Sequence, residues 1–335
     1  MNNIKKVGLS ALAGSLAMVS AHAVEYSVSG DAQAVYSSAQ GNEAGAEAKN
    51  GKGIGVDTDL AFSAAGELDN GWTVSINSLY NTDGTVTNSS NQMTIGMGSL
   101  GTLQFNDVLG SAANGIDDVM PKAYEEPWDG TTTTSEFNIF GSATTSGSLD
   151  YRTPSFDMMG LTLSATATYD PQAGVDAPSA GSVGGDGASG EAFTVKIAHD
   201  SGITIGGGNE SVGNTDATVG QDAATGYILY ANGPVSVGYQ EFYYNAATGG
   251  ADSEGDGYAI AYTAGDMSFS YSVQKETTQA LGATAALEEE EVSAIQASYT
   301  MGAMTIGASM YETDNIDGVA STKYEETELS VSFAF

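Results

Sequence analysis

The segment Met267-Ser268-Phe269-Ser270-Tyr271-Ser272-Val273 decides the fold class of this chain. Its large apolar residues alternate with serines, so the apolar side chains fall on one face of an extended strand and the serines on the other. The segment Leu161-Thr162-Leu163-Ser164-Ala165-Thr166-Ala167-Thr168-Tyr169 repeats this pattern with threonines. Strict alternation of this length is typical of a β-strand with one apolar and one polar face.

The same alternation recurs along the chain and predicts about sixteen strands. They lie near residues 24–36, 54–68, 72–80, 91–98, 102–106, 148–156, 161–170, 192–199, 203–212, 226–231, 235–244, 257–263, 267–276, 291–301, 304–313 and 324–335. Seven tight turns, such as Asp69-Asn70-Gly71 and Asn232-Gly233-Pro234, alternate with eight long Gly/Ser/Asp-rich loops. All short turns should therefore lie at one end of the sheet and all long loops at the other.

An antiparallel sheet of this size is expected to close into a barrel, because closure removes its unpaired edges. The polar faces carry Ser, Thr, Asn, Gln and Gly, which are too small and too polar to form a dry core for so wide a ring. The apolar faces should then point outward into lipid, as in outer-membrane barrels. We predict an all-β fold, a 16-stranded antiparallel transmembrane β-barrel formed by residues 24–335 as a single domain.

The first 23 residues have the layout of a cleavable export signal. Lys5 and Lys6 precede an apolar run over residues 7–19, and Ala21-His22-Ala23 has the A-x-A form of a signal-peptidase site. The run is too short for a membrane-spanning helix of about 20 residues. We predict that residues 1–23 are removed by cleavage after Ala23.

Charge and composition restrict the partners. Residues 1–23 carry two of the nine basic residues and no acidic one, so cleavage changes the formal charge from −33 to −35. This charge excludes nucleic acid as a natural partner, because binding to phosphate backbones needs clustered Lys and Arg. It favours cations instead. The chain has no cysteine, and so neither a disulfide nor a thiolate metal site.

Residues 107–147 form the longest irregular segment between predicted strands. Loops of this length are uncommon in compact domains and are usually functional or disordered. Pro121, Pro127 and Trp128 are spaced through it together with several carboxylates. One interpretation is a mobile surface loop. The other is that the segment folds into a cavity walled by the strands and places its carboxylates where a solute must pass.

Three further patterns point to a known family. The last segment, Leu329-Ser330-Val331-Ser332-Phe333-Ala334-Phe335, ends the chain on an aromatic residue. The predicted mature start is Val24-Glu25-Tyr26-Ser27-Val28-Ser29-Gly30-Asp31, and Leu103-Gln104-Phe105-Asn106-Asp107 leads into the long third loop. With the export signal, these patterns make the chain resemble the Gram-negative general diffusion porins, and most of all their short alphaproteobacterial type.

This resemblance implies an outer-membrane homotrimer of sixteen-stranded barrels, each a water-filled channel narrowed by the third loop folded into the lumen. It implies that small hydrophilic solutes and ions diffuse passively through the channel and that Phe335 is read by the outer-membrane assembly machinery. Its partners would be outer-membrane lipid, further copies of itself, and the solutes. The carboxylates of the constriction would be among Asp107, Asp117, Asp118, Glu125, Glu126, Asp129 and Glu136.

The predicted pore wall departs from the family pattern, which sets a ladder of arginines opposite the loop. Arg152 is the only arginine in the chain, and alternation points it inward with Asp150. Lys196 is also predicted to point inward, whereas Asp57 and Asp59 occupy inward positions where another basic rung is expected. The sequence therefore predicts a weakly cation-selective channel.

Other functions stay open. An enzyme is disfavoured because the chain has no H-E-x-x-H or G-x-S-x-G motif. A secreted acidic calcium-binding β-repeat or adhesin protein is a stronger alternative, since Gly184-Gly185-Asp186-Gly187 resembles the turns of calcium β-helices. A substrate-specific rather than general channel is a third. We expect no required cofactor, although acidic loops such as residues 288–291 could bind Ca²⁺ through oxygen ligands.

Overall fold

The computed structural model describes residues 24–42, 50–82, 85–107, 111–130, 140–141, 144, 147–173, 188–213, 220–246, 251–280 and 287–335. The predicted export signal, Glu136 and the glycine-rich segment 184–187 lie outside the described residues.

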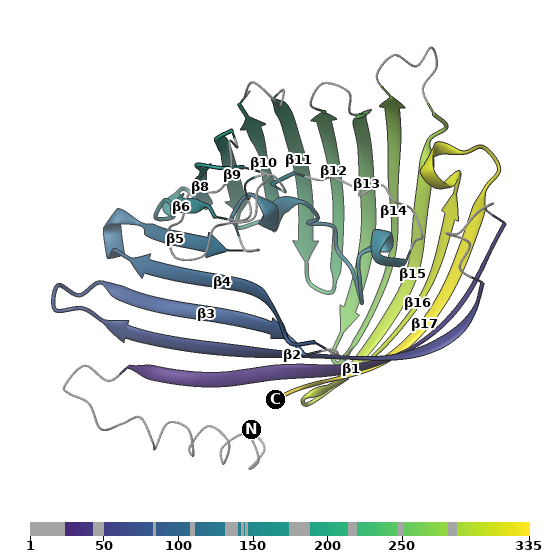
Figure 1. Ribbon diagram of the computed structural model, residues 1–335, viewed down its shortest axis with the longest axis horizontal. Coiled ribbons are helices and arrows are strands. Elements are labelled where there is room, and N and C mark those ends of the chain that lie inside the picture. Colours follow the sequence, from purple (N-terminus) through teal and green to yellow (C-terminus); the bar gives the residue numbers. More distant parts are fainter. Residues whose placement is uncertain are drawn as a thin grey trace.

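One antiparallel sheet contains all the strands of the described residues. They are β1 (Glu25–Gly41), β2 (Gly51–Glu67), β3 (Thr73–Asn81), β4 (Thr87–Gly96), β5 (Thr102–Asp107), β6 (Leu149–Arg152), β7 (Phe156–Met158), β8 (Leu161–Asp170), β9 (Gly190–His199), β10 (Ile203–Val212), β11 (Gln221–Asn232), β12 (Val235–Asn245), β13 (Ala251–Ala264), β14 (Met267–Ala280), β15 (Glu290–Met301), β16 (Met304–Asp314) and β17 (Lys323–Ala334). Strand β1 pairs with both β2 and β17, so the sheet closes into a ring (Figure 1).

The ring has sixteen strand positions, because β6 and β7 occupy one of them. Both pair antiparallel with β8 and are separated only by residues 153–155. Pro154 lies in this break, and proline has no N–H to donate to a neighbouring strand. The predicted 16-stranded antiparallel barrel is thus confirmed, and a closed antiparallel ring excludes the β-helix of the calcium-binding alternative.

Several strands are longer at the long-loop end than the alternation indicated. Strand β1 continues to Gly41 instead of residue 36, and β13 begins at Ala251 instead of residue 257. In these extensions both faces are polar or small, so the apolar signal is lost while the pairing continues, as between Asp252 and Gln279. Backbone hydrogen bonds between strands need no apolar side chain, which explains why the prediction stopped short.

The short turns lie together at the opposite end of the ring. Each of the seven contains a glycine with positive φ. At Gly202 the φ is 92°, and a Cβ would come within 2.0 Å of the Ala231 carbonyl oxygen, so no other residue fits this turn without rearrangement.

The two faces of the wall have the predicted polarity. Large apolar side chains are exposed on the outside, for example Ile54 (79% exposed) and Met310 (61%). Inward positions carry buried polar side chains, among them Gln240 (0%) and Gln296 (2%). This is the reverse of a soluble protein and fits a barrel that faces lipid outside and water inside.

The remaining regular elements of the described residues are short 3₁₀ turns: η1 (Gly98–Leu100), η2 (Asn114–Ile116), η3 (Pro127–Gly130) and η6 (Ile316–Gly318). Within the part of the chain that the structure describes, no helix is long and apolar enough to span a membrane.

Candidate functional site

Residues 111–130, which contain η2 and η3, contact the polar inner face of the wall (Figure 1). The Val119 N–H donates to Gln240 Oε1 of β12 at 3.1 Å, and the Tyr124 N–H donates to Gln296 Oε1 of β15 at 3.2 Å. On the other side, Gln33 Nε2 of β1 donates to the Tyr124 hydroxyl at 2.8 Å. The segment is therefore held against inward-facing side chains and is not a surface loop.

Buried carboxylates hold the two ends of the long segment. Near its start, the Ala112 N–H donates to Asp150 Oδ2 at 2.7 Å. Near its end, the Gly141 N–H donates to Glu210 Oε2 at 3.0 Å and the Thr144 hydroxyl donates to Glu210 Oε1 at 2.7 Å. Asp150 and Glu210 are 0% and 2% exposed. Charge-assisted hydrogen bonds of this kind are stronger than neutral ones, so they fix where the segment leaves and rejoins the wall.

Two of the predicted constriction residues, Asp117 and Asp118, follow η2. The Asp117 carboxylate accepts hydrogen bonds from Asn114 Nδ2 (3.3 Å) and from the Asp118 N–H (2.8 Å). Asp118 accepts from the Met120 N–H at 2.8 Å, and only 4% of its side chain is exposed. Its nearest base is Lys122, whose Nζ lies 3.8 Å from Oδ2.

Three more of the predicted residues lie around η3: Glu125 and Glu126 just before it and Asp129 within it. Glu125 Oε2 accepts from the Tyr311 hydroxyl at 3.4 Å, and Glu126 forms an ion pair with Lys122. Asp129 Oδ2 accepts from the Glu126 N–H at 3.2 Å. The structure thus brings five of the predicted carboxylates into one short stretch, with Lys122 as its single base.

Burial in this stretch disfavours the charged form of its aspartates. Burial, the largest cause, and the charge of Glu126 together raise the pKa of Asp118 to about 6, while the charge of Lys122 opposes the shift. Burial and the charges of Glu126 and Glu125 also raise the pKa of Asp129 to about 6, although part of this side chain is exposed, so Asp118 is the better-defined titrating group. The pKa of Asp117 is raised mainly by burial.

Asp107 does not belong to this set. It lies opposite Asn91, which donates to Asp107 Oδ2 at 3.3 Å, and it shares the outer face of β5 with the exposed Phe105. The buried residues Gln104 and Asn106 alternate with these two. The prediction that Asp107 lines the constriction is wrong, because β5 extends to this residue and its alternation turns the carboxylate outward.

Arg152 and Lys196 lie on the inner face of the wall. Arg152 Nη2 lies 3.3 Å from Asp150 Oδ2, so this guanidinium is already paired with a carboxylate. Lys196 stands opposite Ser164 and lines a cavity of about 160 Å³ together with Ile116 and Tyr227. Among the described residues, Arg152 and Lys196 are the only basic side chains on the inner wall.

The wall of β1 and β2 is acidic. Asp57 lies opposite Gln33, whose contact with Tyr124 marks the inner face, and Asn81 Nδ2 donates to Asp57 Oδ1 at 3.2 Å. Asp59 lies opposite Asp31, on the same face. Directly opposed residues of antiparallel strands share a face, so Asp31 points inward together with Asp57 and Asp59, the two positions where another basic rung is expected.

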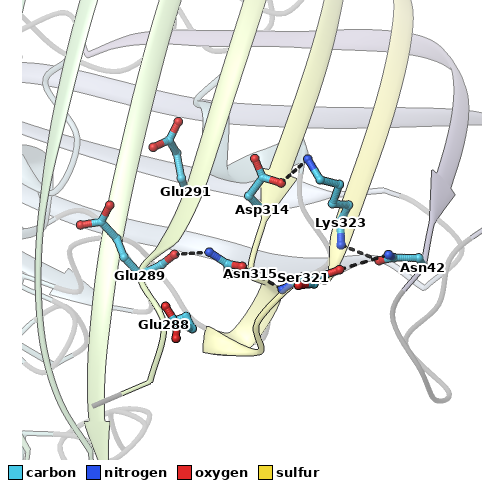
Figure 2. Close-up of a pocket in the computed structure, with 8 residues that line it drawn as sticks. All are labelled: Asn42, Glu288, Glu289, Glu291, Asp314, Asn315, Ser321 and Lys323. Carbon is cyan, nitrogen blue, oxygen red and sulfur yellow. Dashed lines mark hydrogen bonds and ion pairs between the residues drawn. The ribbon is translucent and has the colours of Figure 1, made fainter. Parts of the chain in front are cut away.

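Phe335 and the acidic outer loop lie away from the constriction segment. Phe335 is 57% exposed, and its backbone exchanges hydrogen bonds with Gly30 at 2.8 Å. At the long-loop end, Glu288, Glu289, Glu291 and Asp314 line a cavity of about 520 Å³ beside Lys323, which pairs with Asp314 at 2.6 Å (Figure 2). No group of three or more Asp, Glu, His or Cys side chains among the described residues is arranged to hold a metal ion.

Sequence reasoning missed the wall residues that hold the segment. They are Gln240, Ser270, Gln296, Tyr311 and Glu210. A signal was present, because each glutamine is a long amide beside small residues at the neighbouring inward positions, Gly238 before Gln240 and Ala294 and Ser298 around Gln296. Their partners could not be identified, because the segment they bind has no periodicity.

Comparisons with known proteins agree with this architecture. The sequence matches the family described as Gram-negative porin over residues 8–335. No curated protein matches the chain.

Several solved outer-membrane proteins have a similar fold. Salmonella typhi OmpF, solved in complex with daunomycin, is 10% identical with a TM-score of 0.68, over 93% of this chain and 98% of that one. The trimer form of OmpT from Vibrio cholerae is 13% identical with a TM-score of 0.65, over 93% and 100%. A mutant of Rh. blastica porin is 14% identical with a TM-score of 0.55, over 92% and 100%. At these identities the likeness shows the fold.

Proposed function

Because the chain belongs to the Gram-negative porin family, we propose that its barrel is a water-filled channel through which ions and small hydrophilic solutes diffuse passively, with residues 111–130 as the constriction. Family and fold support an outer-membrane diffusion channel rather than an enzyme. The observation that carries the proposal is the attachment of an acidic segment to the polar inner face of a closed barrel.

The charges around this segment favour cations. Lys122 is paired with Glu126, and Arg152 is paired with Asp150, so neither leaves a free positive charge for an anion. Lys196 is then the main base opposed to the remaining carboxylates of the segment and to Asp31, Asp57 and Asp59 on the wall. Acidic groups that line a narrow channel select cations, since low-dielectric walls strengthen their field.

The proposal includes the assembled state. We propose that residues 1–23 are removed during export and that the assembly machinery recognises Phe335. We also propose that the protein forms a homotrimer in the outer membrane, which the trimer form of Vibrio cholerae OmpT supports. No cofactor is needed for passive diffusion, and Ca²⁺ bound at the outer loops stays a prediction. Whether the channel is general or substrate-specific depends on which solutes pass the carboxylates.

The selectivity is tested by neutralising charges at two places. Replacing Asp117, Asp118, Glu125 and Glu126 with their amides should move the zero-current potential in a KCl gradient across a planar bilayer towards the anionic side. The control, amides at the exposed Glu288 and Glu289 just before β15, should move it much less, because charges facing bulk water are screened over about 8–10 Å. Equal shifts in the two variants would show that residues 111–130 are not the constriction.

A further inference from the structure

Two buried glutamines bind the backbone of the constriction segment in the same way. Gln240 Oε1 accepts from the Val119 N–H, and its Nε2 donates to the carbonyl oxygens of Ile116 (2.9 Å) and Asp117 (3.2 Å). Gln296 Oε1 accepts from the Tyr124 N–H, and its Nε2 donates to the Glu125 carbonyl at 2.6 Å. Each amide therefore uses its donor and its acceptor on the segment, as a neighbouring strand would.

Each glutamine also has a partner on the wall: Gln240 Nε2 donates to Thr225 Oγ1 at 2.9 Å, and Gln296 Oε1 accepts from the Ser270 hydroxyl at 3.2 Å. A buried amide or peptide group that loses its hydrogen bonds keeps the full penalty of leaving water, so both partners favour the attached state. Between the two glutamines, the Ser270 hydroxyl accepts from the Ala123 N–H at 2.9 Å. Polar side chains of β12, β14 and β15 thus bind residues 116–125, and β13 lies between β12 and β14.

Two glycines leave room on the wall for the segment. A Cβ at Gly238 would lie 2.8 Å from Pro121 Cδ, and a Cβ at Gly307 would lie 2.5 Å from Tyr124 Cδ2. Both glycines occupy inward positions, two residues from Gln240 and from Ser309 respectively. Glycine at these positions lets the segment approach the wall closely enough for the glutamines to reach its backbone.

We propose that Gln240 and Gln296 are positioning residues that set the width of the channel. They hold the two ends of the stretch that carries Asp117, Asp118 and Lys122, so this stretch cannot move away from the wall into the open lumen. The inference rests on the proposed function, since it assumes that residues 111–130 are the constriction. Both glutamines are uncharged, so the width they set does not follow the ionisation of the carboxylates between them.

The test is single-channel recording of the folded, full-length protein in planar bilayers with 1 M KCl. In Gln240→Ala or Gln296→Ala, each of which removes at least two hydrogen bonds, the time spent in sublevels of altered conductance should rise about tenfold over wild type. The double variant should exceed either single one. The matched control is Gln104→Ala, another buried inward glutamine, which hydrogen-bonds to Thr94 and Asn106 of the wall.

A second variant disturbs the contact between the wall and the constriction segment without changing either glutamine. Gly307→Ala displaces the Tyr124 ring and should also produce altered sublevels, even if a glutamine variant fails to fold. Heat-dependent mobility on a gel shows that each barrel is folded. The inference is overturned if folded Gln240→Ala, Gln296→Ala and Gly307→Ala all conduct like Gln104→Ala. Failure of the proposed function would look different, because the wild-type protein itself would then form no cation-selective channel.

Discussion

Acidification should weaken the cation selectivity of the channel, with a midpoint near pH 6. The perturbation acts on Asp118 and Asp129, whose pKa values are both raised to about 6, burial being the largest cause. A carboxyl group with this pKa is about nine-tenths ionised at pH 7 and about one-tenth ionised at pH 5. The segment therefore loses roughly one and a half negative charges over this range. Because protonation removes negative charge, cation selectivity can only decrease as the pH falls.

The size of the effect follows from Coulomb's law. An ion about 8 Å from a unit charge in water gains or loses about 0.5 kcal/mol, and screening at 0.1 M salt roughly halves this energy. Losing one and a half charges then changes the energies of a cation and an anion by about 0.4 kcal/mol each, in opposite directions. The ratio of K⁺ to Cl⁻ permeability should fall about fourfold between pH 7 and pH 5.

The assay is the zero-current potential in a KCl gradient near 0.1 M, measured at both pH values. The variant carrying Asp118→Asn and Asp129→Asn should be less selective than wild type at pH 7 and nearly independent of pH. Amides at Glu288 and Glu289 of the outer loop serve as the control and should leave the pH dependence intact. If the double asparagine variant keeps the full wild-type pH dependence, the titrating groups lie elsewhere and the reasoning fails.

Two further predictions concern topology and assembly. Asn42→Cys, at the long-loop end, should react with a membrane-impermeant thiol reagent on intact cells, whereas Asn70→Cys, in the β2–β3 turn, should not; equal labelling would contradict the orientation. Deleting Phe335 removes one exposed ring and its backbone contact with Gly30, so refolding in detergent should change little. If assembly machinery reads this residue, the amount of protein in the outer membrane should fall sharply. Unchanged amounts in cells would refute that role.

The barrel could be predicted from the sequence because its determinants are periodic. Alternation such as Met267 to Val273 gives the strands and their faces, and the glycine turns give the antiparallel order. The prediction failed where periodicity carries no information. Residues 37–41 are polar or small on both faces yet continue β1, and Pro154 divides a strand that had been predicted as continuous.

The constriction segment could be predicted only as a set of charges. Its carboxylates were visible in the sequence, but their burial depends on which wall residues they meet, and Asp107 shows that one residue of strand extension reverses a side chain. The contacts of Gln240 and Gln296 join residues more than a hundred positions apart. Contacts at that distance in the sequence leave no local pattern, so only the structure reveals them.

The same polar inner face serves two purposes that can be separated by experiment. It lines the lumen with polar groups, and its buried amides hydrogen-bond to the backbone of the segment. The carboxylates that set selectivity titrate near pH 6, whereas the glutamines that we infer set the width do not titrate at all. In 1 M KCl, where screening extends over only about 3 Å, conductance reports width more than charge. Conductance in 1 M KCl should therefore stay constant from pH 7 to pH 5 while selectivity in dilute salt declines. A fall of both together would mean that the carboxylates, and not the amides, hold the segment in place.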